Sequence, residues 1–265
     1  MDLQLAGRRA VVTGASRGIG KAVARMLVLE GVDTVVCSRS QQNADDVAAE
    51  LTSLGHANAI PGVVELTNDE SIKAMVDSAA ERLGGVDIVV NSGAMVSGYL
   101  PEDFDHITDS LVLSAFEEKL VGTLRVSRHA VPYMRQNGWG RIISIGGHTS
   151  RNSGSIAAGA RNAALVNLTK NLADTLGKDG ITANVVHPAT TTTETLHERM
   201  HKVASRRGLD VDEHLARVSA QNAIRRLVDA NEIAAVVTFL VSPLASGITG
   251  EAISVTGGAG NAVYY

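Results

Sequence analysis

A glycine-rich turn near the N-terminus combines residue types suited to holding phosphate groups. The apolar segment 9–13 (RAVVT) runs into Thr13-Gly14-Ala15-Ser16-Arg17-Gly18-Ile19-Gly20, and a helix-forming stretch follows. Gly14 permits a tight turn, and Gly18 and Gly20 let the backbone approach a pyrophosphate. Free N–H groups and the positive dipole end of the helix favour anions there. The predicted contacts with a nucleotide are Gly14, Ser16, Arg17, Gly18, Ile19 and Gly20.

The end of the second predicted strand indicates which dinucleotide binds. The strand 34–37 is followed by Ser38-Arg39. In dinucleotide-binding folds an acidic side chain at this place accepts hydrogen bonds from the ribose of NAD. Arg39 instead offers a planar cation to a 2′-phosphate, and Arg17 would reinforce it. We therefore expect NADP(H) rather than NAD, although two solvated surface arginines remain the alternative interpretation.

Short segments rich in Val and Ile alternate with helix-length segments along the chain. The strands are expected at 9–13, 34–37, 86–90, 141–145, 182–186 and 252–255. The helices are expected at 18–30, 43–54, 69–83, 114–137, 157–176 and 231–240. This rhythm predicts an α/β fold, a Rossmann-type doubly wound parallel sheet in a three-layer α/β/α arrangement. No linker or repeat interrupts it, so we expect a single domain over residues 1–265.

Composition excludes several classes of protein. The formal net charge is −4, which argues against a nucleic-acid partner, since such proteins usually carry a strongly basic surface. No apolar run approaches the roughly 18 residues that a membrane span needs. The first residues lack the apolar stretch of a signal peptide, and Cys37 is the sole cysteine. A cytoplasmic protein without an internal disulfide is expected.

Four segments resemble motifs of the short-chain dehydrogenase/reductase family. Thr13–Gly20 matches its TGxxxGxG loop, and Val90–Ala94 is similar to its VNNAG turn. Val185–Ala189 with Thr193 resembles its N-x-x-x-P-G-x-x-x-T stretch, and Gly250–Gly258 resembles its terminal ITGxxxxxDGG. The resemblance spans almost the whole chain. It adds these residues to the expected cofactor site: Glu65, Leu66, Asn91, Ser92, Gly93, Asn162, Pro188 and Thr193. It also implies a homodimer or homotetramer built through the helices 114–137 and 157–176.

The family's catalytic residues are replaced in this chain. The resemblance implies a Tyr that acts as general acid/base, a Lys four residues later, a Ser that polarises the substrate oxygen, and an Asn. No tyrosine of this chain has a lysine four residues after it. The flanking sequence aligns Ala158 with the Tyr, Asn162 with the Lys, Gly147 with the Ser and Lys119 with the Asn. The cofactor site is thus expected to be retained while the usual proton relay is absent.

Other side chains are candidates for the missing chemistry. His148 is the best candidate acid because histidine titrates near neutral pH. Lys119 would supply a cation near the lost ammonium, and Asn162 would hydrogen-bond a ribose hydroxyl. Ser150, Ser153 and Ser155 lie in the same loop and are candidates for holding an oxygen. Alternatively, His148 is a solvated loop residue and Lys119 extends along a helix face to reach water.

These residues favour an oxidoreductase that acts on the carbonyl/hydroxyl pair of a small-molecule substrate at a non-standard active site. Two other functions stay open. The first is a nucleotide-binding protein without hydride chemistry, acting as a cofactor sensor or as an inactive subunit. The second is lyase or isomerase chemistry in the same cleft. The fold alone does not decide among them.

Two segments are expected to border the substrate. The long charged stretch 190–222 resembles the family's mobile substrate lid, although a surface for subunit contact is the alternative. The stretch between Ala94 and Lys119 is longer than usual in the family and contains Tyr99, Glu102, Asp103, Asp105 and His106.

The lid contains a match to a metal-binding motif. His197-Glu198-Arg199-Met200-His201 has the HExxH pattern that places two zinc ligands on one helix face. Leu196, Met200 and Val203 form an apolar stripe, which puts the histidines on the solvent flank. We therefore expect no metal site, with His214 the nearby candidate for a third ligand if there were one.

Overall fold

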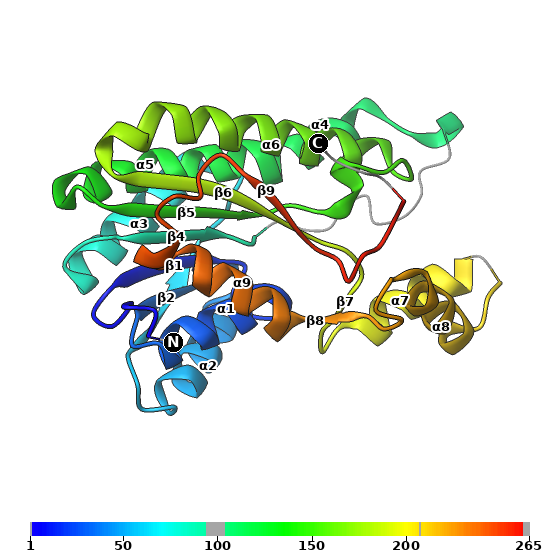
Figure 1. Cartoon of the computed structure of the whole chain (residues 1–265), viewed down its shortest axis with the longest axis horizontal. Coiled ribbons are helices and arrows are strands. Elements are labelled where there is room, and N and C mark those ends of the chain that lie inside the picture. The colour runs from blue at the N-terminus through cyan, green and yellow to red at the C-terminus, as the bar shows by residue number, and fades with distance from the viewer. Residues whose placement is uncertain (1, 94–103, 207, 262–265) are drawn as a thin grey trace.

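Seven parallel strands form the central sheet of the computed structural model, which describes residues 2–93, 104–206 and 208–261 (Figure 1). Each strand pairs in parallel with its neighbours. The spatial order reverses at β1, as a doubly wound sheet requires. In that order the strands are β3 (Ala59–Val63), β2 (Asp33–Ser38), β1 (Arg9–Thr13), β4 (Ile88–Asn91), β5 (Gly140–Ile145), β6 (Ile181–Pro188) and β9 (Ala252–Val255).

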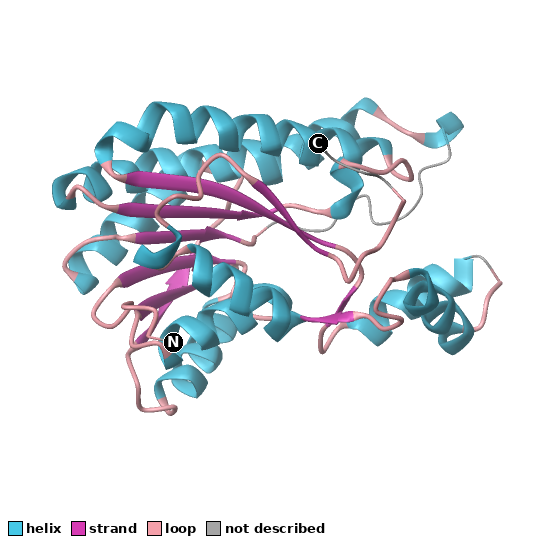
Figure 2. Cartoon of the chain, viewed as in Figure 1, coloured by secondary structure: helices cyan, strands magenta, loops and turns pink. Residues whose placement is uncertain are grey.

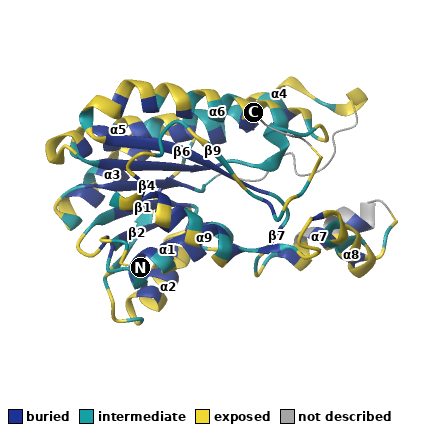
Figure 3. Ribbon diagram, viewed as in Figure 1, coloured by how far each residue is buried: buried dark blue, intermediate teal, exposed yellow. Residues whose placement is uncertain are grey.

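Helices cover both faces of the sheet (Figure 2). One face packs on α1 (Gly18–Leu29), α2 (Gln41–Thr52) and α9 (Ala230–Leu240). The other packs on α3 (Asp69–Leu83), α5 (Gly122–Asn137) and α6 (Ile156–Leu176). The inner strands are buried from both sides (Figure 3), and Val, Ile, Leu and Ala fill both cores. The predicted three-layer α/β/α fold is confirmed.

The sequence analysis missed the edge strand β3. Its residues AIPGV include Pro61 and Gly62, which interrupt the apolar run that marks the other strands. Proline is tolerated on an edge strand, where one side of the backbone needs no partner. A Cβ on Gly62 would lie 2.8 Å from Cγ1 of Val35, so glycine lets β3 pack against β2.

The predicted helix 114–137 is wrong in its start and in its continuity. A separate helix, α4 (Asp109–Phe116), begins after Thr108, whose hydroxyl accepts a hydrogen bond from the N–H of Leu111. A π-helical turn, Glu117–Val121, then leads into α5. Such turns insert one extra residue into a helix and are frequent at functional sites. Lys119 lies in the middle of this turn.

The segment expected to be a lid contains two helices, α7 (Leu196–Arg206) and α8 (Val211–Gln221). Leu196, Met200, Ala204 and Val211 form a small core of their own. The segment is joined to the body by the paired strands β7 (Thr191–Thr192) and β8 (Val228–Asp229). In Figure 1 it lies beyond the end of the sheet where β6 finishes.

Short 3₁₀ turns occupy Phe104–His106, His148–Ser150, Gly177–Asp179 and Pro243–Ala245. Within the described ranges, none of the helices has the length and apolar character to cross a bilayer.

Candidate active site

A cavity of about 1140 Å³ opens at the carboxyl ends of the strands. The segments that follow β1, β2, β4, β5 and β6 all contribute to its wall. Open parallel sheets bind their ligands at this edge, where the strand order reverses. The cavity extends from the glycine-rich turn before α1 to the first turns of α6, so it joins both halves of the predicted site.

The glycine-rich turn packs tightly against the loop after β4. A Cβ on Gly14, whose φ is +63°, would lie 2.6 Å from the Cα of Gly93. A Cβ on Gly20 would collide with the carbonyl oxygen of Gly14. The Thr13 hydroxyl accepts a 3.0 Å hydrogen bond from the N–H of Gly93. Backbone therefore forms this end of the cavity, as close approach of a pyrophosphate requires.

Nearly all of the predicted cofactor contacts line the cavity. Arg17 and Arg39 are exposed at its rim, and Ser38 is buried beside them. Asn91 is the exception: it is buried in β4, its amide atoms have no partner among the described residues, and it is not part of the wall. The predicted contacts that do line the cavity are Gly14, Ser16, Arg17, Gly18, Ile19, Gly20, Ser38, Arg39, Glu65, Leu66, Ser92, Gly93, Asn162, Pro188 and Thr193.

All four positions aligned with the family's catalytic residues meet in the same cavity wall. Ala158 and Asn162 lie one turn apart on α6, Gly147 follows β5, and Lys119 comes from the π-helical turn. The hydroxyl of Ser155 caps α6 by accepting a hydrogen bond from the N–H of Ala158. The four aligned positions, which come from three different segments of the chain, therefore lie together in one cavity wall.

Asn162 and Gly147 fit each other closely. The Asn162 side chain is buried, and its Nδ2 donates a 2.9 Å hydrogen bond to the Thr149 hydroxyl. A Cβ on Gly147 would lie 2.7 Å from the same Nδ2. The amide of Asn162 therefore occupies space that a serine at 147 would need. Its Oδ1 is buried without a hydrogen-bond partner in the described part of the chain, and so it is an acceptor available to a ligand.

Lys119 is a buried cation in this wall. It is 8% exposed, and the described residues offer its ammonium neither a hydrogen bond nor an ion pair. Burial, together with the positive charge of Arg161 on α6, lowers the pKa of Lys119 to about 7. Arg161 is itself 5% exposed. The structure therefore does not support the interpretation of Lys119 as a helix-surface lysine reaching into bulk water.

His148 lies at the start of the turn after β5 and lines the cavity. Both ring nitrogens are buried, and neither has a hydrogen-bond partner among the residues described. Burial, helped by the charge of Arg151, lowers the pKa of His148 below its ordinary value. The ring is therefore mostly neutral at pH 7 and carries one N–H that can be donated.

His187, at the end of β6, is a site residue that the sequence analysis missed. It is fully buried, and its Nδ1 accepts a 2.9 Å hydrogen bond from the N–H of Gly147. Burial is the main cause that lowers the pKa of His187 to about 4. The ring proton therefore resides on Nε2, which is 3.3 Å from the Ser150 hydroxyl. In this tautomer His187 cannot take a proton from Ser150; it fixes the turn that carries Gly147 instead.

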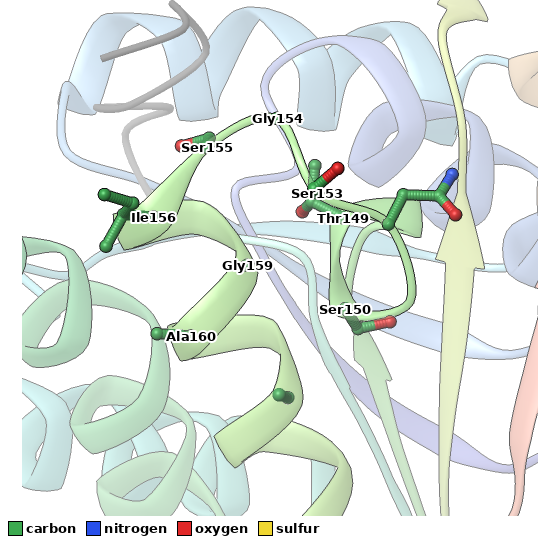
Figure 4. Close-up of a pocket in the computed structure, with 10 residues that line it drawn as sticks. Thr149, Ser150, Ser153, Gly154, Ser155, Ile156, Gly159 and Ala160 are labelled. Atoms are coloured by element: carbon green, nitrogen blue, oxygen red, sulfur yellow. The ribbon is translucent and has the colours of Figure 1, made fainter. Parts of the chain in front are cut away.

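The three candidate serines all line a small hollow, and two of them also line the large cavity. A smaller hollow of about 570 Å³ lies against the first turns of α6, and Ser150, Ser153 and Ser155 all line it (Figure 4). Ser153 and Ser155 also line the large cavity, whereas Ser150 does not. Ser153 and Ser155 are therefore the serines placed to meet a ligand there.

Several other candidates lie away from the cavity or outside the described residues. The hydroxyl of Tyr133 donates to Asp77 on α3, far along the helix layer. Tyr99, Glu102, Asp103, Tyr264 and Tyr265 lie outside the described residues, while Asp105 and His106 are exposed in a 3₁₀ turn. The side chain of His197 is exposed, and its Nε2 lies 3.5 Å from Oδ1 of Asp212. The described ranges contain no group of three or more metal-ligating side chains.

The glycine-rich turn, the doubly wound sheet and the cavity at its carboxyl edge are together the features of the dinucleotide-binding fold. Residues 14–260 match the family described as enoyl-(acyl carrier protein) reductase. The chain belongs to the short-chain dehydrogenase/reductase family.

Relatives span the full length of the chain. It is 33% identical to the 3-oxoacyl-(acyl-carrier-protein) reductase FabG of Vibrio cholerae, covering 97% of this chain and 98% of that one. It is 29% identical to the NADPH-dependent reductase BacG of Bacillus subtilis, over 95% and 97% of the two chains. The structure of L-sorbose reductase from Gluconobacter frateurii, complexed with NADPH and L-sorbose, superposes with a TM-score of 0.90 at 28% identity, covering 97% and 98% of the chains.

Proposed function

We propose that this protein is an NADP(H)-dependent oxidoreductase that interconverts a carbonyl and a hydroxyl group on a small molecule, with residues that differ from the family's usual relay. One observation carries the proposal: a single cavity connects the glycine-rich turn with Lys119, His148 and Asn162. The NADPH-dependent relatives support the choice of reaction class.

Residues at both ends of the cavity fit the cofactor. The turn 14–20 presents backbone N–H groups, and at Gly14 and Gly20 a Cβ would collide with neighbouring backbone. Arg39 and Arg17 would pair with a 2′-phosphate, since an arginine fork matches phosphate oxygens. The unpartnered Oδ1 of Asn162 would accept a hydrogen bond from a ribose hydroxyl. When bound, NADPH supplies a hydride.

The reacting end of the cavity would use groups other than a tyrosine. Ala158 has neither a donor nor an acceptor in its side chain, so it cannot transfer a proton. The N–H of His148 would donate to the substrate oxygen, and the Lys119 ammonium would stabilise negative charge on a ligand oxygen. His187 holds the Gly147 backbone beside them. The helices α7 and α8 would cover the substrate and exclude water.

Titration of the protein with NADPH and with NADH, followed by cofactor fluorescence, tests the cofactor preference. We expect NADPH to bind more tightly than NADH. Arg39→Ala should weaken the affinity for NADPH by at least about tenfold and leave the affinity for NADH unchanged. Arg25→Ala, an exposed change on α1, is the matched control. Tighter binding of NADH to the unaltered protein would refute the assignment.

Oxidation of NADPH in the presence of a panel of ketones and aldehydes tests the reaction itself. Turnover of any panel member that is lost in Lys119→Met supports the proposal. Tight NADPH binding without turnover across the panel would favour the alternative of a nucleotide sensor or inactive subunit.

The helix α6 also presents the small residues Gly159, Ala160 and Ala163 along one side of its N-terminal half, where Ala160 and Ala163 are exposed. Small side chains allow close helix packing, and family resemblance suggests a homodimer or homotetramer through this region. Analytical ultracentrifugation of the protein and of Ala160→Glu tests this assembly. A monomer at micromolar concentration in the unaltered protein would count against it.

A further inference from the structure

The ammonium group of Lys119 forms no ion pair with a carboxylate among the described residues. Its side chain is more than nine-tenths buried and lines the large cavity. Burying an ion without a partner is costly, and proteins normally pair such a charge or neutralise it. The pKa of about 7 fits this situation, because the protein itself does little to stabilise the ammonium form.

The charged and titratable groups around Lys119 do not neutralise its positive charge. Glu118 and Arg161 line the same wall, and each has interactions of its own. His187 and His148 have lowered pKa values, so both are mostly neutral at pH 7. Residues i and i+1 on a helical turn do not face each other, and the charge that acts on Lys119 is the like charge of Arg161.

We propose that Lys119 binds a carboxylate on the substrate, so that the substrates are carbonyl compounds, or the matching alcohols, that carry a carboxylate. The inference rests on the proposed function, because it takes this cavity as the substrate site. One unpaired ammonium matches one negative charge. The pyrophosphate and the 2′-phosphate of the cofactor belong at the opposite end of the cavity, with the glycine-rich turn and the exposed Arg17 and Arg39.

Binding of matched acids and esters tests the proposal without relying on turnover. The probes are 2-oxobutanoate, 3-oxobutanoate and 4-oxopentanoate, which place the carboxylate at three distances from the carbonyl, each compared with its methyl ester. Calorimetric titration is carried out with and without NADP⁺. We expect at least one acid to bind at least about tenfold more tightly than its ester.

Variants identify the group responsible. Lys119→Met should remove the preference for the acid, whereas Lys119→Arg should retain much of it. Lys73→Met, which changes an exposed lysine on α3, is the matched control and should behave as the unaltered protein. Acid binding to the unaltered protein should be tighter at pH 6 than at pH 8.5, because Lys119 loses its proton near pH 7. Lys119→Arg should flatten this dependence, since arginine stays charged.

Three outcomes would overturn the proposal: esters that bind as tightly as the acids, an acid preference that survives in Lys119→Met, or no binding of any acid. The last counts against it even if NADPH binds and neutral ketones are reduced. Conversely, Lys119-dependent binding of an acid without NADPH binding would refute the proposed function while supporting Lys119 as a carboxylate-binding residue.

Discussion

The carboxylate of Glu194 accepts a 2.6 Å hydrogen bond from the backbone N–H of Gly18. Gly18 is the first residue of α1, and Glu194 lies at the start of the segment that contains α7 and α8. A side chain from the segment that contains α7 and α8 thus accepts a hydrogen bond from one of the N–H groups that the glycine-rich turn offers to anions. A cofactor phosphate and this carboxylate would compete for the same donor and would repel each other.

Replacing Glu194 by Gln should therefore tighten NADPH binding by about twofold to tenfold, the range expected for removing a competing charge near a helix N-terminus. Fluorescence titration measures the affinity. Glu213→Gln, an exposed change on α8, is the control. Weaker binding in Glu194→Gln would show that the carboxylate assists the cofactor and does not compete with it.

The stability of the protein should fall on acidification because of His187. Its pKa is about 4 in the folded protein against an ordinary value of 6.5, so between these values the unfolded chain binds more protons. Stability therefore rises with pH in that window, with a slope of up to about 1.4 kcal/mol per pH unit from this residue. Urea unfolding between pH 4.5 and pH 7.5 measures it.

His187→Asn should flatten that slope, because an amide oxygen can still accept the hydrogen bond from Gly147 but does not titrate. His148→Gln is the comparison, since the lowered pKa of His148 contributes a slope of the same sign. An unchanged slope in His187→Asn would mean that His187 does not stay neutral in the folded protein.

Placing a serine at position 147, as the family resemblance implies for that position, should destabilise this chain. The added Cβ would meet Nδ2 of Asn162, and Asn162 is held by Thr149. We expect Gly147→Ser to cost about 1–3 kcal/mol in the free energy of unfolding, the usual range for overpacking a buried site. Gly147→Ser combined with Asn162→Ala should recover much of that loss. A double-mutant cycle from denaturant unfolding measures the coupling, and additive costs would disprove the steric conflict.

If His148 is the acid, His148→Ala should lower kcat by at least about 100-fold on whichever substrate is found, the usual contribution of general acid catalysis. The control is His56→Ala, since His56 lies exposed on a loop outside the cavity. An unaffected kcat would remove His148 from the mechanism, and with it the explanation offered for the absent tyrosine.

Local patterns were sufficient to predict the fold, and they selected residues that line one cavity. Strand–helix alternation and the glycine spacing depend on residues close in sequence. All six predicted strands appear in the sheet, and the seventh strand, β3, was not predicted. Hydrophobic periodicity cannot reveal a π-helical turn, which inserts one residue into a regular pattern. The burial of Lys119 therefore had to come from the structure.

The contacts that shape the two ends of the cavity join residues distant in sequence. His187 meets Gly147 across 40 positions, and Glu194 meets Gly18 across 176. No local pattern encodes such pairs. A histidine within an otherwise apolar strand end, VVHP, was the available signal for His187, since a polar ring there needs a buried partner.

The ring of His187 also has a consequence for Gly146. A Cβ at 146 would lie 2.6 Å from Cε1 of that ring, so no larger residue can stand there while the imidazole is present. Positions 146 and 187 should accordingly vary together: chains with histidine at 187 require glycine at 146, and a small residue at 187 releases that requirement. This covariation offers a compact signature for finding other proteins in which an imidazole has taken over the support of this turn.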